Sequence, residues 1–315
     1  MNITIYEDLR THLFIEYFSS KTMFLNEEFG ITKKQLFEQY GVFDGCDDIA
    51  RKIIKTLETY PDSNSVFVPI GNSFIDSVYA ERKDADGIKT AAYLPTISTF
   101  RKDENNKERF SQVTIYIKKN ANKHELFGSI MHELTHAYQD ICMKNNGLSM
   151  TDKLKDFGYH LNDINKHSDW RDTSVSHLLY FFNKFESGAY IAQIDGELKG
   201  SGKVFDTVND VMDFIRGTTV YRNYELMFSH VDYIRNVENT EDRKMILKYA
   251  NERSNNSFKT FDDFIRWILV RCKDTKRKFK EALPKIAHKN LKVFEIFSPN
   301  PDVLLESINN KIVEK

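Results

Sequence analysis

The chain has 315 residues, of which 41% are hydrophobic, and its 45 basic and 46 acidic side chains leave a net charge of −1. This length is sufficient to bury a sizeable core and fits two compact units. Because the charges balance, the composition excludes a strong overall field that would draw the protein to nucleic acid or to a membrane surface.

The first 60 residues have a helical pattern, which is clearest over 6–26 and 47–59. Four segments rich in β-branched and aromatic residues follow, at 65–71, 74–82, 91–100 and 110–118, with turn-like clusters of Gly, Asn and Asp between them. We expect them to form a small, mostly antiparallel sheet. In the last segment Val113, Ile115 and Ile117 alternate with more polar residues, which predicts one buried face and one wet face.

Residues 123–143 have the period of one long helix. Asn122 is expected to cap its start and Gly147 to end it. One stripe is apolar: Leu126, Ile130, Leu134, Ala137 and Ile141. His132 and His136 lie almost opposite this stripe, so we expect a helix with one buried face and one polar face that forms the floor of a cleft.

The polar face contains the pattern H-E-x-x-H, made by His132, Glu133 and His136. Residues four apart lie one turn apart on the same face of a helix, so two neutral imidazoles can bind one metal ion there. Glu133 projects to the side of the ion, where it could take a proton from a water molecule and return it to a leaving amine. The alternative interpretation is a solvated polar face without a metal.

A catalytic zinc site usually has three protein ligands. Cys142 is one candidate for the third, but without a helix-breaking Gly at position 139 it lies on a different face from the His pair. Glu186 is the better candidate, because residues 172–199 are predicted to form a second long helix and Glu186 lies close to its apolar stripe. A carboxylate facing a buried surface needs a cation or strong donors. An ion pair with Lys or Arg remains the alternative.

Residues 148–171 have a weak period and could line a cleft. His160, His167 and Asp169 in this segment are reserve ligand candidates. No metal-ligand spacing joins them to the H-E-x-x-H pattern, which favours their interpretation as surface polar residues.

After Gly202 the pattern is helical again, over 206–216, 221–234, 240–251, 261–282 and 301–312. We therefore expect two domains, 1–202 and 203–315. Residues 271–292 are rich in Lys and Arg. We interpret this basic stretch as a solvated helix face and do not expect a nucleic-acid partner, although a basic-helix nucleic-acid binder is a third hypothesis.

The HELTH segment at 132–136 and the ESGAY segment at 186–190 together resemble the zincin metallopeptidases, and among them the gluzincin arrangement of two His and a downstream Glu. The resemblance covers about residues 64 to 200. It implies an α+β, zincin-like fold, with a small, mostly antiparallel sheet packed on the active-site helix. The helical patterns described above add helices at both ends of the chain. The resemblance also implies a zinc ion held by His132, His136 and Glu186, with Glu133 as general base. Many gluzincins have an Asp four residues after the ligand Glu, where this chain has Tyr190.

The resemblance further implies that the strand before the active-site helix is an edge that pairs with an extended substrate; an ordinary interior strand is the alternative. The expected function is a zinc metallopeptidase with a protein or peptide substrate. The candidates for binding substrate or stabilising an oxyanion are chosen only by chemical type: Tyr190, Tyr221, Tyr224 and His230. The alternative is a catalytically inactive zincin-like domain that acts as a structural or protein-interaction module.

Three cysteines form no paired framework, which suits a reducing compartment. The first residues lack the basic and apolar regions of a secretory signal, and the apolar run at 264–270 is too short to cross a bilayer. We therefore expect a cytoplasmic protein without a membrane partner.

Overall fold

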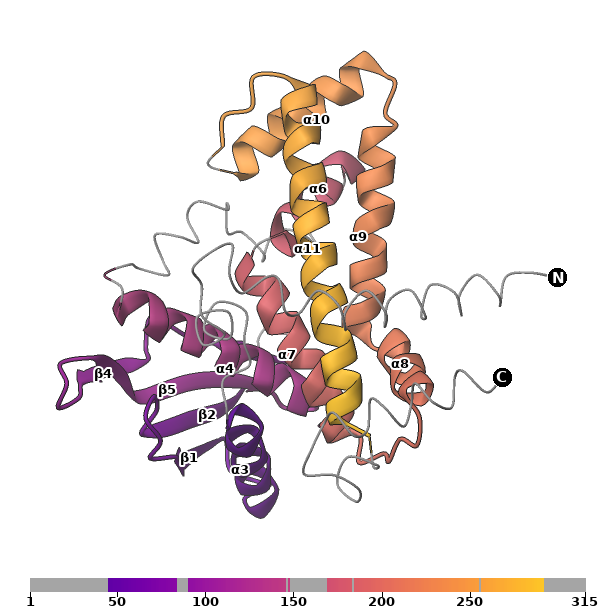
Figure 1. Ribbon diagram of the computed structural model, residues 1–315. Coiled ribbons are helices and arrows are strands. Elements are labelled where there is room, and N and C mark those ends of the chain that lie inside the picture. The colour runs from indigo at the N-terminus through magenta and orange to yellow at the C-terminus, as the bar shows by residue number, and fades with distance from the viewer. Residues whose placement is uncertain are drawn as a thin grey trace. The chain divides into compact units, whose positions relative to one another are not determined.

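The computed structural model describes residues 45–83, 90–145, 147, 169–182, 184–254 and 256–291. These residues all belong to one compact unit, which begins at residue 42. The helices predicted over 6–26 and 301–312 lie outside the described residues. Within the described part the fold is α+β, with a small mixed sheet and helices before and after it (Figure 1).

The sheet consists of β1 (Ser65–Pro69), β2 (Ser77–Lys83), β3 (Ala91–Tyr93), β4 (Thr99–Lys102) and β5 (Glu108–Lys118). Its order is β1-β2-β5-β3, and β4 also pairs with β5. The pairings β1–β2, β3–β5 and β4–β5 are antiparallel, whereas β2–β5 is parallel. The strand that precedes the H-E-x-x-H helix, β5, is therefore an interior strand, and β3 lies at the edge.

The strand predicted over 91–100 is two short strands, β3 and β4, that pair with successive parts of β5. A turn over 95–97 separates them, and the Ser98 backbone N–H bonds to the Leu94 carbonyl. Pro95 explains the interruption, because its ring removes a backbone donor and fixes φ at a value that suits a turn.

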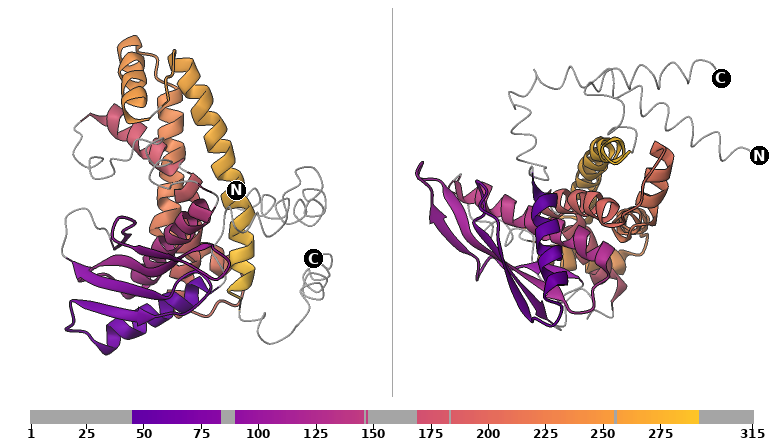
Figure 2. Two further views of the ribbon diagram at one scale, coloured as in Figure 1. Left: turned by 90° about the vertical axis from the view of Figure 1, so that its left-hand side faces the viewer. Right: turned by 90° about the horizontal axis from the view of Figure 1, so that it is seen from below.

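One face of the sheet packs against α3 (Cys46–Thr59) and α4 (Lys123–Asn145) (Figure 2). The inward residues of β5, Val113, Ile115 and Ile117, are almost inaccessible to solvent, as their alternation predicts. Phe67 on β1 points the other way and is exposed.

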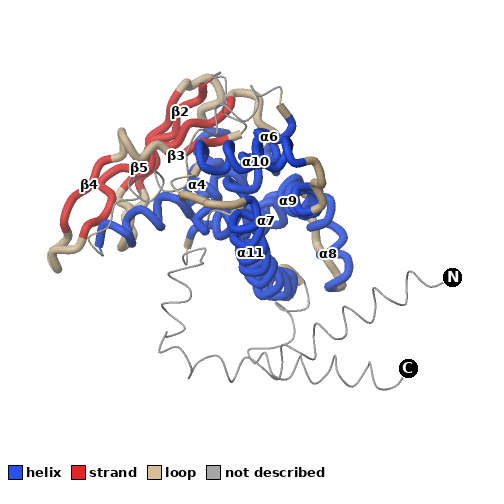
Figure 3. Tube along the Cα trace, turned by 90° about the horizontal axis from the view of Figure 1, so that it is seen from above, coloured by secondary structure: helices blue, strands red, loops and turns tan. Residues whose placement is uncertain are grey.

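The helix α4 begins and ends where the sequence predicts. The Asn122 side chain accepts a hydrogen bond from the His124 backbone N–H, and Gly147 has a positive φ of 69°. The predicted apolar stripe faces the sheet. The opposite face, however, is not an open cleft floor, because α7 (Lys184–Gly200) packs along it (Figure 3). This second contact buries His132 and His136.

Glycine residues allow α4 and α7 to approach each other closely. A Cβ atom at Gly128 would lie 2.6 Å from the Glu197 Cγ and 2.8 Å from the Gln193 carbonyl oxygen. A Cβ at Gly196 would lie 2.7 Å from the Gly128 Cα. Atoms do not approach so closely without displacement, so larger residues at these positions would push the two helices apart.

The single helix predicted over 172–199 is two helices, α6 (Trp170–Phe181) and α7. The break follows Phe182, whose backbone N–H still bonds to the Leu178 carbonyl. Phe181 and Phe182 are both buried, although adjacent residues of a straight helix point about 100° apart. Both rings belong to one apolar cluster, and no Gly or Pro announces the break.

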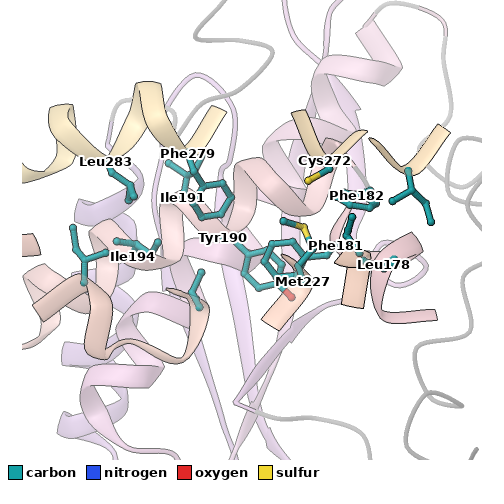
Figure 4. Packing of buried hydrophobic residues seen from close by; sticks show 14 of the residues in the cluster. Leu178, Phe181, Phe182, Tyr190, Ile191, Ile194, Met227, Cys272, Phe279 and Leu283 are labelled. Atoms are coloured by element: carbon teal, nitrogen blue, oxygen red, sulfur yellow. The ribbon is translucent and has the colours of Figure 1, made fainter. Parts of the chain in front are cut away.

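The remaining helices are α8 (Val208–Gly217), α9 (Thr219–Arg235), α10 (Thr240–Arg253) and α11 (Phe261–Lys289). With α6 and α7 they build a second apolar cluster, part of which is seen in Figure 4. The helix α11 was expected to end at 282 but continues through Pro284. Leu283, Ile286 and Ala287 join the cluster, and their burial offsets the one backbone hydrogen bond that Pro284 cannot donate.

The two apolar clusters meet at the contact between α4 and α7, because α4 contributes to the sheet-side cluster and α7 to the helical one. The division into domains at residue 202 stays a prediction. None of the described helices combines the length and the apolar character needed to cross a bilayer.

The close approach of α4 and α7 gives a test of the fold. We expect Gly128→Ala to lower the free energy of unfolding by about 1–3 kcal/mol, because the new methyl group overlaps α7. Urea denaturation would measure the change. Gly217→Ala is the matched control, since Gly217 ends α8 with nothing within 4 Å of a new Cβ, and it should not lower stability. An equally stable Gly128→Ala chain would contradict this packing.

Candidate metal centre

Two neighbouring side chains of α4 and a third from α7 converge at the contact between these helices. The Nε2 atoms of His132 and His136 are 3.0 Å apart. The Glu186 carboxylate faces both rings, with Oε2 at 3.4 Å from the His132 Nε2 and Oε1 at 3.4 Å from the His136 Nε2. Among the described residues, this is the one group of His, Cys, Asp and Glu side chains close enough together to hold a metal ion.

The spacing of these atoms fits metal coordination. Nitrogen and carboxylate ligands bind a tetrahedral divalent ion at about 2.0–2.2 Å, which places neighbouring ligand atoms about 3.3–3.6 Å apart. The two imidazole–carboxylate separations of 3.4 Å, each to a different oxygen of Glu186, fall in this range, and the 3.0 Å between the two Nε2 atoms is slightly shorter. The residues present therefore fit a bound metal ion.

The group is buried to an extent that calls for charge compensation. His132 and His136 are each 7% exposed and Glu186 is 1% exposed. Burial alone would lower the pKa of His136, but the charge and hydrogen bond of Glu186, with smaller contributions from Glu133 and Gln139, together raise this pKa to about 9. Burial alone would raise the pKa of Glu186, yet the two imidazoles hold it well below its ordinary value. Without a metal, the centre is thus a buried ion pair.

The outer nitrogens of the two imidazoles have different surroundings. The His136 Nδ1 is 3.0 Å from the Oε1 of Gln139, which is also buried. The His132 Nδ1 is buried and has no hydrogen-bond partner among the described residues. The Tyr190 ring meets the His132 ring edge-on at 5.1 Å between centroids.

Glu133 is only partly buried and is attached to the edge of the sheet. Its Oε2 accepts a hydrogen bond of 2.7 Å from the backbone N–H of Tyr93 in β3. The Tyr93 hydroxyl donates to Asp140, two turns further along α4, at 2.7 Å. Burial raises the pKa of Asp140, and the bond from Tyr93 opposes part of this effect. These two bonds fix β3 against the helix that carries the His pair.

The structure brings Tyr190 to the centre and places the other three candidates in contacts elsewhere. Burial raises the pKa of the Tyr190 hydroxyl, and the ring stacks on Phe181. Tyr221 and Tyr224 lie on α9, where the Tyr224 ring stacks on Phe279 of α11. His230, also on α9, bonds through Nδ1 to the Ser174 hydroxyl at 3.0 Å.

The other possible ligands take different positions. Cys142 packs against the sheet-side cluster, away from the face that carries the His pair. The carboxylate of Asp169 caps α6 and pairs with Arg171. His160 and His167 lie outside the described residues.

Sequence reasoning missed Gln139 and Tyr93 as parts of the site. The spacing of Gln139 from His136 was a usable signal, because residues three apart meet on a helix surface. Tyr93 could not be found in this way, because it lies 40 residues from Glu133 and the contact depends on the sheet.

Searches against protein-family models, curated proteins and solved structures find no match for this chain. Function is therefore inferred from the geometry and chemistry of the site.

The ion pair of the metal-free protein gives a pH-dependent stability. Because the folded pKa of His136 rises from 6.5 to about 9, its stabilising contribution is full below pH 6.5 and is lost as the pH rises through 9. The contribution of Glu186, whose pKa is lowered, is present above pH 4.5 and is lost only in acid. Urea denaturation in the presence of a chelator should therefore show a loss of stability between pH 6.5 and 9.

Glu186→Gln separates this pair from other titrating groups. The variant should be less stable at pH 6.5, because the buried ion pair is lost and burial then favours the neutral form of His136. Its free energy of unfolding should also lack the additional decrease that the wild type shows between pH 6.5 and 9. The same decline in both proteins would argue against the pair.

Proposed function

We propose that this protein is a zinc-dependent metallopeptidase that hydrolyses peptide bonds in a protein or peptide substrate. The observation that supports the proposal most strongly is the convergence of His132, His136 and Glu186 beside Glu133. Two imidazole nitrogens and one carboxylate form a common ligand set of catalytic zinc, with a further position open to water or substrate. Bound zinc would supply a Lewis acid that polarises the substrate carbonyl and makes water acidic enough to react near neutral pH.

The protein's own residues would supply the remaining chemistry. Glu133 is adjacent to a ligand on the same helix, and its carboxylate can take a proton from the attacking water and give it to the leaving amine. The Tyr93 N–H holds Oε2 of this carboxylate, which limits the rotation of the side chain. An ordered base needs less rearrangement before proton transfer.

The edge strand β3 is the proposed place for the substrate backbone. The Leu94 N–H bonds inward to the Thr114 carbonyl of β5, while the Tyr93 N–H points outward to Glu133. The outer edge of β3 is thus directed toward the proposed base. An extended peptide that lies along this edge would bring its scissile bond near Glu133. Tyr190, beside His132, remains the candidate for oxyanion stabilisation that lies nearest the centre.

The alternative is a zincin-like domain that binds metal without turnover, as a structural or interaction module. The near-complete burial of the three ligands favours it, because a structural site needs no access for substrate. Its weakness is that such a site usually has four protein ligands, whereas three come together among the described residues.

We also propose a cytoplasmic location, since the three cysteines form no disulfide with each other.

The role of Glu133 can be tested with Glu133→Gln, which preserves the shape of the side chain but cannot act as a base. We expect zinc content to stay at one per chain and hydrolysis of an unstructured protein such as casein to fall by about 10²- to 10⁴-fold. Glu125→Gln is the control, because Glu125 is an exposed glutamate two turns earlier on the same helix. It should retain activity.

Two results would count against the proposal. A fully active Glu133→Gln chain would exclude Glu133 as the base. A wild-type chain that binds zinc but cleaves no member of a mixed peptide library would favour the inactive module.

A further inference from the structure

The two proposed His ligands differ in what holds their rings in place. A ligand imidazole that binds a metal through Nε2 usually donates its Nδ1–H to an acceptor, which fixes the tautomer and the orientation of the ring. In this chain the residue four positions after Glu186 is Tyr190, and its ring rather than its hydroxyl meets His132. The His132 Nδ1 has no hydrogen-bond partner among the residues described.

The acceptor is found on α4 itself, one turn beyond the second His. Gln139 Oε1 lies 3.0 Å from the His136 Nδ1, and both side chains are 7% exposed. Because an amide oxygen can only accept, the bond requires a proton on Nδ1, so Nε2 is the nitrogen that can bind a metal once the ion has displaced its proton. The Nε2 points toward His132 and Glu186, as this tautomer requires.

The helix makes this arrangement rigid. Residues three apart on a helix lie on one face, so Gln139 reaches the His136 ring without a long or mobile connection. Burial also excludes water, which would otherwise compete for the Nδ1 proton. The bond therefore orients His136 before a metal arrives.

We propose that Gln139 is the positioning residue of the metal centre, which selects the metal-binding tautomer of His136, and that Tyr190 packs against His132 without acting as a hydrogen-bond partner. This inference rests on the proposed metal site. It names the side chain that orients one of the two proposed His ligands.

The test is the affinity of the full chain for Zn²⁺ at pH 7, measured by competition with a chromophoric chelator. Gln139→Leu keeps a buried side chain of similar size and removes the acceptor, so affinity should fall by about 10- to 100-fold. Gln139→Met serves the same purpose if the leucine variant does not fold. Gln139→Glu restores an acceptor oxygen and should bind Zn²⁺ about as tightly as the wild type.

Two further variants distinguish a role of Gln139 in orienting His136 from a general disturbance of the fold. Gln193→Leu is the matched control, because Gln193 is a partly buried glutamine of α7 that bonds to Glu197. It should leave Zn²⁺ affinity unchanged. Tyr190→Phe should do the same, because only the hydroxyl is removed. With Co²⁺ in place of Zn²⁺, the visible absorption of the Gln139→Leu chain should differ from that of the wild type, since one ligand is less well oriented.

The inference is overturned if Gln139→Leu and Gln139→Met bind Zn²⁺ as tightly as the wild type, or if Tyr190→Phe loses as much affinity as they do. A different result would contradict the proposed function. A wild-type chain that binds no Zn²⁺, or one that binds it equally well after His132→Ala, has no metal centre for Gln139 to position.

Discussion

The buried carboxylate of Glu186 is the group on which the interpretation of this protein depends. An isolated carboxylate in an apolar interior costs several kcal/mol, and this one is 1% exposed within the contact between two helices. Two imidazoles face it, and together they provide either a buried ion pair or three ligands for one cation. A fold that needed only helix packing at this position would be better served by an apolar residue.

The rest of the architecture explains how these groups meet. The sheet supports one face of α4, and the opposite face carries His132 and His136 toward α7. Gly128 and Gly196 remove the side chains that would keep α7 away, so Glu186 can reach both rings. On the other side, β3 holds Glu133 through a backbone N–H and so links the sheet edge to the proposed base. The centre is thus built from an apolar sheet interface, a close helix contact and one edge strand.

The local parts of this structure could be predicted from the sequence. The period of α4, its cap at Asn122 and the alternation in β5 are properties of neighbouring residues, and the structure shares them. The H-E-x-x-H spacing also fixes the two His on one face, whatever surrounds the helix. Pro95 was a signal for the turn between β3 and β4 that the β-branched composition of the segment obscured.

Long-range packing could not be predicted in the same way. The break after Phe182 has neither a Gly nor a Pro to mark it in the sequence. The face of α4 with the His pair was expected to form the floor of a cleft because its residues are polar, and only the position of α7 shows that it is buried. Glu186 was nevertheless identified as a ligand candidate, because a carboxylate beside an apolar stripe requires a partner.

The coordination of zinc in the purified protein is the most direct test of the central claim. X-ray absorption at the zinc edge distinguishes nitrogen and oxygen ligands at about 2.0–2.2 Å from sulfur at about 2.3 Å. We expect one zinc per chain with two imidazoles, oxygen ligands and no sulfur, and loss of this signal in Glu186→Ala. A sulfur ligand, or an unchanged zinc spectrum without the Glu186 carboxylate, would contradict the account.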